Sequence, residues 1–244
     1  MNSPSCGSMR ILLMATLVAV GGASTEALSG SLSATPTSLT VASPGAAAAL
    51  TVSGRGEGST AGQVRVLRWL QQDGAEKLVP TRDVVASPPA LRLDPGKEMT
   101  VRLVRTAKSA VAGEECYRVL VDQLPGAEQD GIAVKFALRH SIPLCFDAAK
   151  QKQGAVDWGL RRKGNALVLC GSNAGQRRVV AKNVKITGAG GASASLGSAT
   201  VLGGGEMSWP LKGKLKGFTP GSAFTLTATI NGKAVEVKGK VGGG

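Results

Sequence analysis

The stretch GIAVKFALRHSIPLCF, Gly131–Phe146, reads as a strand with two faces, because large apolar side chains alternate with small or charged ones from Ile132 to Arg139. In an extended strand, one side would carry four apolar side chains, those of Ile132, Val134, Phe136 and Leu138. Such alternation is typical of a strand with one buried face. The pattern leaves open whether the apolar row packs in the core of this protein or against another one.

Short β-rich runs of the same kind fill the first half of the chain and are separated by Gly, Pro and Asn. Strands are expected near Ser38–Ala42, Ala48–Ser53, Gln63–Gln71, Asp83–Ala86, Glu98–Arg105, Cys116–Gln123 and Ile132–Cys145. Seven short strands within about 120 residues favour an immunoglobulin-like sandwich. Trp69 lies in the third strand, where such sandwiches often bury a tryptophan.

A second β unit follows a polar segment. Its clearest element is a hairpin in which Asn231-Gly232 separates two alternating runs, because Asn-Gly is the strongest short hairpin signal. A two-residue turn pairs Ile230 with Lys233. The same register places four side chains on one face: Leu226, Ala228, Val235 and Val237.

The predicted fold is therefore all-β, with two immunoglobulin-like domains. We expect a first domain over residues 28–147, a linker over 148–154 and a second domain over 155–244. Residues 1–27 are predicted to be a secretory signal peptide, because a basic start precedes a short apolar run and a small-residue exit. The apolar run is too short to span a bilayer, and no later stretch predicts a transmembrane helix or stable membrane insertion.

The net charge of +13 suggests nucleic acid, an anionic membrane or an acidic protein as partner. Nucleic acid is disfavoured for an exported chain with few aromatic residues. The single histidine, His140, excludes a His-rich metal site. Because no motif for a catalytic serine, for zinc or for phosphate binding is present, we expect no enzyme, cofactor or metal.

Cys116 opens one expected strand and Cys145 closes the next. In an antiparallel pair with a turn near Asp130–Gly131, these two residues would oppose each other, which would permit a disulfide in an oxidising compartment. The alternative is two small buried hydrophobic side chains.

Three segments in order, SPPALRLDPGKEMTVRLVR (Ser87–Arg105), ECYRVLVDQLPG (Glu115–Gly126) and GIAVKFALRHSIPLCF, resemble the periplasmic PapD-like pilus-assembly chaperones. The SIP sequence near the end of the last segment resembles the archaic-type members. The resemblance covers most of residues 30–147 and is thinner beyond. It implies two immunoglobulin-like domains in a boomerang, with a cleft between them.

The resemblance also implies a function. Such chaperones capture pilin subunits in the periplasm, lend them a strand and deliver them to an outer-membrane usher. The donor strand would present Ile132, Val134, Phe136 and Leu138 to the open groove of the subunit.

One departure from the family concerns the two basic residues that bind the carboxyl terminus of the subunit. By alignment, Ser38 and Pro143 stand at these positions, and neither carries a charge. Substitute anchors are expected among Arg102, Arg118 and Arg139, since an arginine fork suits a carboxylate. The competing interpretation for each of them is a solvated surface arginine.

Two other functions compete with a chaperone. The chain could be an exported immunoglobulin-like adhesin or structural module that binds acidic polymers through a basic face. It could also be an enzyme with an unrecognised site.

Overall fold

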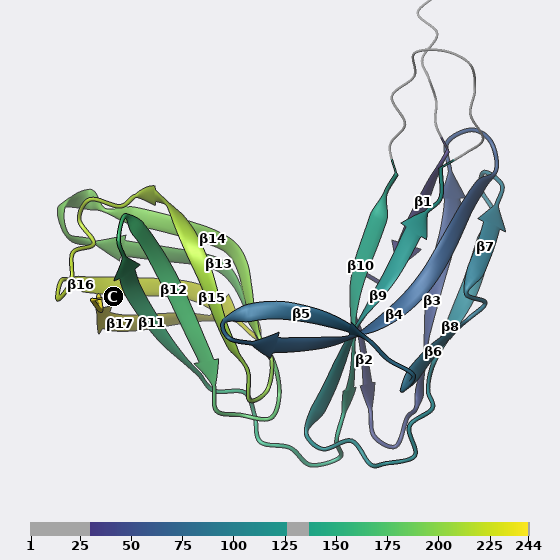
Figure 1. The fold of residues 1–244 in the computed structure, drawn as a ribbon, viewed down its shortest axis with the longest axis horizontal. Helices are drawn as coiled ribbons and strands as arrows, with labels where there is room; N and C mark the ends of the chain where they lie inside the picture. Colours follow the sequence, from purple (N-terminus) through teal and green to yellow (C-terminus); the bar gives the residue numbers. More distant parts are fainter. Residues whose placement is uncertain (1–29, 126–136, 244) are drawn as a thin grey trace, which may run out of the picture.

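The computed structural model describes residues 30–125 and 137–243. The expected signal peptide therefore lies outside the described residues. Within the described part, no helix is long and apolar enough to cross a bilayer, and the one helical element is the 3-10 turn η1, Ala189–Gly191. The fold is all-β, as the sequence predicts. Figure 1 shows two domains set at an angle and joined at their lower ends.

The first domain is a sandwich of two sheets. One sheet has the order β1-β3-β8-β6, with bounds Ser31–Thr35, Ala47–Arg55, Glu98–Arg105 and Val84–Ser87. The other has the order β2-β10-β9-β4-β5, with bounds Leu39–Ala42, Arg139–Asp147, Glu114–Gln123, Thr60–Gln72 and Ala75–Pro80. A short strand, β7 (Ala90–Leu93), pairs with β4. The short strands β1, β5 and β7 are not among those expected from the sequence.

Alternation along these strands builds the core between the two sheets. Leu50 and Val52 of β3 and Val101 and Leu103 of β8 are fully buried, and they pack with apolar side chains of β9 and β10. Tyr117 lies at the centre, where its ring meets that of Phe146 edge-on, with 6.0 Å between the centroids.

The second domain is one continuous sheet of seven strands, β11-β12-β15-β14-β13-β16-β17. Their bounds are Val156–Lys163, Ala166–Asn173, Glu206–Lys214, Ser193–Val201, Val179–Gly188, Ala223–Ile230 and Lys233–Lys240. The sheet curls so that Arg161 of β11 meets Gly242, which follows β17. This curling encloses a second core around Phe218, Ile186 and Leu169.

The hairpin β16–β17 has the predicted register. Ile230 opposes Lys233, Ala228 opposes Val235 and Leu226 opposes Val237. Asn231 and Gly232 both have positive φ, 50° and 77°, which is the backbone conformation of a type I′ turn.

Candidate functional site

One face of strand β10 carries a row of large apolar side chains, and that row continues, beyond His140, past the end of the core. Ile142, Leu144 and Phe146 are buried between the sheets. Leu138 has the same parity, and its carbonyl accepts a hydrogen bond of 2.9 Å from the N–H of Gln123, which continues the β9–β10 pairing. Leu138 is nevertheless 47% exposed. The row therefore begins outside the sandwich that buries its other members.

The outer edge of β10 is free over the same part of the strand. The β2 strand pairs with β10 only from Leu144 to Asp147. Over Arg139–Pro143, no strand among the described residues pairs with that edge. Pro143 lacks an N–H and fits such a place, because proline within sheets is confined mainly to edge strands. Unpaired backbone groups at an edge can accept a strand from another chain.

The other three candidate donor residues, Ile132, Val134 and Phe136, lie outside the described residues. The structure describes the strand from Arg139 onward, whereas the sequence predicts it from Ile132.

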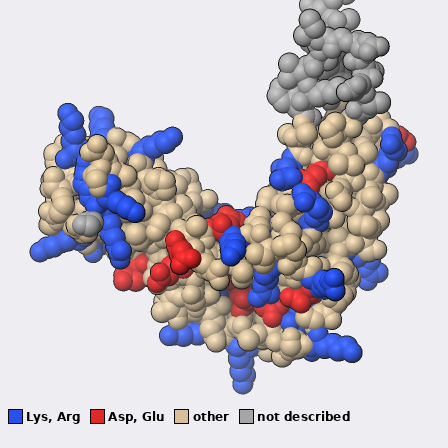
Figure 2. Space-filling model, viewed as in Figure 1, with Lys and Arg blue, Asp and Glu red and all other residues tan. Residues whose placement is uncertain are grey.

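The second domain covers part of the outer face of the β10–β9–β4 sheet. This face lines the cleft between the domains, which Figure 2 shows as a wide concavity. Leu202 of the second domain packs against Trp69, Cys116 and Cys145 at the base of the cleft. Trp69 is buried, as expected, but it packs against the disulfide and the neighbouring domain, while Tyr117 fills the core between the sheets.

The two cysteines are directly opposed across β9 and β10 and form a disulfide, with an S–S distance of 2.02 Å. Glu114 is the one acidic side chain close enough to form a metal-binding group with them among the described residues. Both sulfur atoms are used by the disulfide, so this cluster offers a metal ion a single carboxylate.

Arg118 lies on the cleft face of β9, directly opposite Pro143 of β10. Its guanidinium stacks on the ring of Trp69, 3.8 Å from the ring centroid, and its Nε donates to Glu76 Oε1 at 3.2 Å. The Arg118 side chain remains 20% exposed. An arginine thus lies beside Pro143, one of the two positions at which the resemblance leads us to expect a basic residue.

Arg139 begins β10 and points to the same face, but its charge is already engaged. It donates to Asp122, and so does Arg65, at 2.6 Å. Burial would raise the pKa of the Asp122 carboxyl, but the hydrogen bonds from Arg139 and Arg65 outweigh it and hold that pKa below its usual value.

Arg102 lies apart from the other two. It is exposed on β8, in the opposite sheet, between the buried Val101 and Leu103. Its side chain therefore points away from the face that carries Arg118 and Arg139. Sequence periodicity alone does not reveal which of the two sheets a strand joins.

The contacts that fix the two domains were not found from the sequence. Glu114 accepts hydrogen bonds from the backbone N–H and the guanidinium of Arg178, which also donates to Thr40 Oγ1 at 3.0 Å. Burial raises the pKa of Glu114, and the Arg178 charge opposes that rise. The Gln71 side chain donates to the Thr200 carbonyl and accepts from the Leu202 N–H, both at 2.8 Å. Partners so far apart in the chain leave no local sequence signal.

Comparison with known protein families identifies a match over the first domain. Residues 31–150 match the N-terminal domain of PapD, described as a pili and flagellar-assembly chaperone. Comparison with curated proteins found no similar sequence.

Several solved structures share the fold at low sequence identity. One is the complex of the chaperone CsuC with the tip adhesion subunit CsuE from archaic Csu pili of Acinetobacter baumannii, with 18% identity, a TM-score of 0.66 and coverage of 88% of this chain and 99% of that chain. Another is the E. coli chaperone DraB, with 19% identity, a TM-score of 0.58 and coverage of 86% and 96%. A third is the Salmonella enterica SafA pilin in complex with the SafB chaperone, with 17% identity, a TM-score of 0.58 and coverage of 85% and 95%.

Proposed function

Because the chain belongs to the family of PapD-like pili and flagellar-assembly chaperones, we propose that it binds pilin subunits in the periplasm by donor-strand complementation and delivers them to an outer-membrane usher. The family and fold are those of non-enzymatic chaperones. The observation that carries the proposal is the apolar row of β10, which leaves the core at Leu138 beside an unpaired strand edge.

Two features of β10 support strand donation together. The unpaired backbone over Arg139–Pro143 offers hydrogen bonds to an incoming sheet. The alternation of Gly131–Phe146 would then direct four apolar side chains into a subunit groove: Ile132, Val134, Phe136 and Leu138. Burying four such side chains contributes roughly 6–12 kcal/mol before the costs of association and ordering are subtracted.

We further propose Arg118 as the anchor for the carboxyl terminus of the subunit. It lies on the cleft face beside Pro143 and is partly exposed. Its present partner is Glu76, whose side chain is 41% exposed. If the carboxylate of the subunit replaced Glu76 as the partner of Arg118, no buried charge would be left unpaired. Arg139 is the second choice, because Asp122 already binds it, and Arg102 the third, because it lies on the other sheet.

The domain boundaries remain part of the proposal. The first sheet system ends at Asp147 and the next strand starts at Val156, which supports a linker over residues 148–154 between domains of residues 28–147 and 155–244. Removal of residues 1–27 as a signal peptide would place the mature chain in the periplasm.

The test is co-expression with candidate pilins from the same genomic neighbourhood and purification of the complex. Phe136→Asp should abolish the one-to-one complex, because it would place a charge in the apolar groove. Ala137→Asp is the matched control: it adds the same charge one residue later, on the opposite face of the strand, and the complex should survive. If the complex were lost in both variants, or in neither, donation by this strand would be contradicted.

A further inference from the structure

The positive charge of the chain is concentrated in the second domain. Residues 155–244 contain thirteen lysine and arginine residues against three acidic ones, so they carry +10 of the total +13. Figure 2 shows basic side chains spread over this domain, whereas most acidic side chains in that view lie over the first domain and the junction. The proposed function uses none of this charge, because the donor strand and the anchor belong to the first domain.

Five lysines share one face of the second sheet, and we call this surface the basic face. The register places Lys212, Ser195 and Lys185 side by side across β15, β14 and β13. Two residues further along each strand, a second row contains Lys214, Ser193, Thr187, Thr225 and Lys238. Lys240 lies two residues beyond Lys238 on β17 and faces the same way. Directly opposed residues share a face, and the row between these two, which includes Ile186 and Leu226, is buried. The basic face therefore points to solvent over five strands, about 19 Å across.

The charges on this face have few partners within the protein. One acidic residue, Glu236, lies on it and pairs with Lys238 at 3.1 Å. For the other four lysines, no ion pair is found among the described residues. Because these charges do not stabilise one another or the domain, they are available to an external anion.

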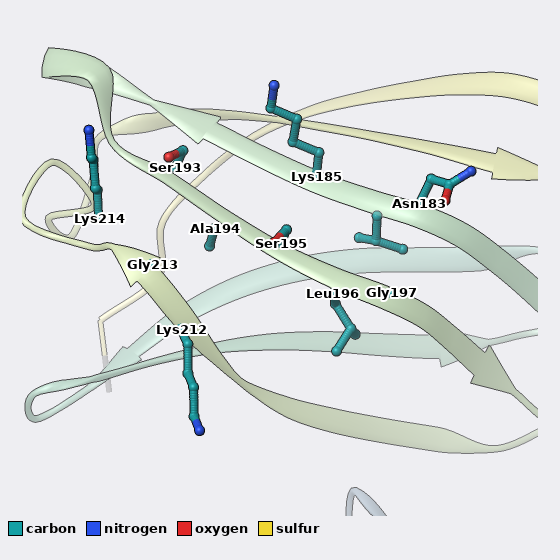
Figure 3. A pocket seen from close by; sticks show the side chains of 11 residues that line it. Asn183, Lys185, Ser193, Ala194, Ser195, Leu196, Gly197, Lys212, Gly213 and Lys214 are labelled. Atoms are coloured by element: carbon teal, nitrogen blue, oxygen red, sulfur yellow. The ribbon is translucent and has the colours of Figure 1, made fainter. Parts of the chain in front are cut away.

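The surface between the lysines is a shallow depression that is open to solvent. Figure 3 shows the short side chains of Ser193 and Ser195 on the middle strand, with Lys185 and Lys212 extending away on either side. A depression of about 520 Å³ lies there, lined by parts of β13, β14 and β15. An extended anionic surface could approach the backbone closely here without displacing a large side chain.

The residue types favour a membrane over a protein partner. Protein interfaces are enriched in Tyr, Trp and Arg and depleted in Lys. The positively charged residues of the basic face are all lysines. The exposed large hydrophobic side chains of the described residues, Leu78, Val85, Leu124 and Leu138, all lie in the first domain. Clusters of basic side chains without apolar anchors suit anionic lipid headgroups, which attract each of them through charge alone.

We propose that the basic face binds reversibly to the surface of bilayers that contain anionic phospholipid. Such binding needs no insertion into the bilayer and is screened by salt. It would leave the β10 edge, which belongs to the other domain, free to receive a subunit.

The experiment is co-sedimentation of the purified protein, without any subunit, with vesicles of phosphatidylcholine alone or mixed with phosphatidylglycerol. Binding is expected only to the mixed vesicles, and it should disappear in high salt. The triple variant Lys185→Gln/Lys212→Gln/Lys214→Gln should lower the partition coefficient on the order of 100-fold, because each lysine near the surface contributes about a factor of five.

The matched control removes the same charge elsewhere. Lys77, Lys97 and Lys108 are exposed lysines of the first domain, and their triple substitution to Gln should leave partitioning nearly unchanged. Equal losses in both triple variants, or equal binding to both kinds of vesicle, would overturn the proposal. So would tight binding of poly-glutamate in the absence of vesicle binding, because it would identify an acidic protein as the partner. Since no subunit is present, failure here leaves the chaperone function untouched.

Discussion

At the scale of single residues, the arginines on the cleft face of the first domain differ in how firmly acidic side chains bind their guanidinium groups. Arg139 and Arg65 share one carboxylate, that of Asp122. Arg118 has one exposed acidic partner and an aromatic ring beneath it. Stacking restricts the guanidinium to one plane, which reduces the conformational entropy lost when it binds a carboxylate.

The first prediction concerns this anchor. Arg118→Ala should weaken subunit binding by about 10- to 100-fold, since a hydrogen bond to a charged group contributes roughly 1.5–3 kcal/mol. Arg102→Ala is the control, because it removes an arginine charge from the opposite sheet and should leave the affinity unchanged. Titration calorimetry with a subunit carboxyl-terminal peptide would measure both. An unchanged affinity in Arg118→Ala would exclude the anchor role.

The second prediction concerns pH. The pKa of Asp122 is depressed in the folded protein below its usual 3.8, chiefly because the hydrogen bonds from Arg139 and Arg65 overcome the effect of burial. Its stabilising contribution is therefore fully present above 3.8 and is lost as the pH falls through the folded-state pKa.

Thermal unfolding of the wild type and of Asp122→Asn tests this from about pH 6 to about pH 2. The wild type should be the more stable protein at the upper end, and the difference should vanish at the lower end, where both side chains are neutral. A difference that persists at the lowest pH would show that the carboxylate charge is not its source.

At the scale of elements, the hairpin β16–β17 depends on one glycine. Gly232 has a φ of 77°, and an added Cβ would meet nothing within 4 Å. The cost of Gly232→Ala is therefore purely that of the backbone conformation, about 1 kcal/mol or somewhat more.

Urea unfolding measures that cost, and Gly159→Ala provides the control. Gly159 lies within β11, where an added Cβ is also unobstructed, and its φ is outside the positive range. Its replacement should leave stability unchanged or raise it slightly, because alanine restricts the unfolded chain. If both variants lost the same free energy, the turn conformation would not be the cause.

At the scale of the whole molecule, the angle between the domains is fixed by a few polar contacts around a small apolar cluster. Arg178 reaches Glu114 and Thr40, and Gln71 holds two backbone groups of the second domain. Because the Glu114 side chain is 1% exposed, its charge depends on Arg178 for compensation.

Arg178→Ala should therefore lower the unfolding free energy by about 3–5 kcal/mol and broaden the distribution of interdomain angles seen by small-angle X-ray scattering. Adding Glu114→Gln should restore most of the stability, since the buried charge is then gone, but not the narrow distribution of angles. If the double variant were no more stable than Arg178→Ala, an unpaired buried charge would not explain the loss.

How much of this structure can be predicted from the sequence depends on how far apart the interacting residues lie in the chain. The Asn231–Gly232 hairpin follows from the sequence with its register, and so does the opposition of Cys116 and Cys145, because a turn fixes the pairing of nearby residues. The burial of Trp69 is expected from its strand, but its partners are not, because they include Leu202, 133 positions later in the chain, as well as the disulfide.

The sequence by itself determined the all-β fold, the two domains and the apolar row of β10, because local alternation and turn residues encode which strands form and which face of each is apolar. Only the tertiary structure decided that this row leaves the core at Leu138, that Arg118 faces the cleft while Arg102 faces away, and that five lysines share one face. Periodicity predicts which side chains share a face of one strand, but it does not predict which strands pair. A site needs side chains from several neighbouring strands, so only the tertiary structure defines it.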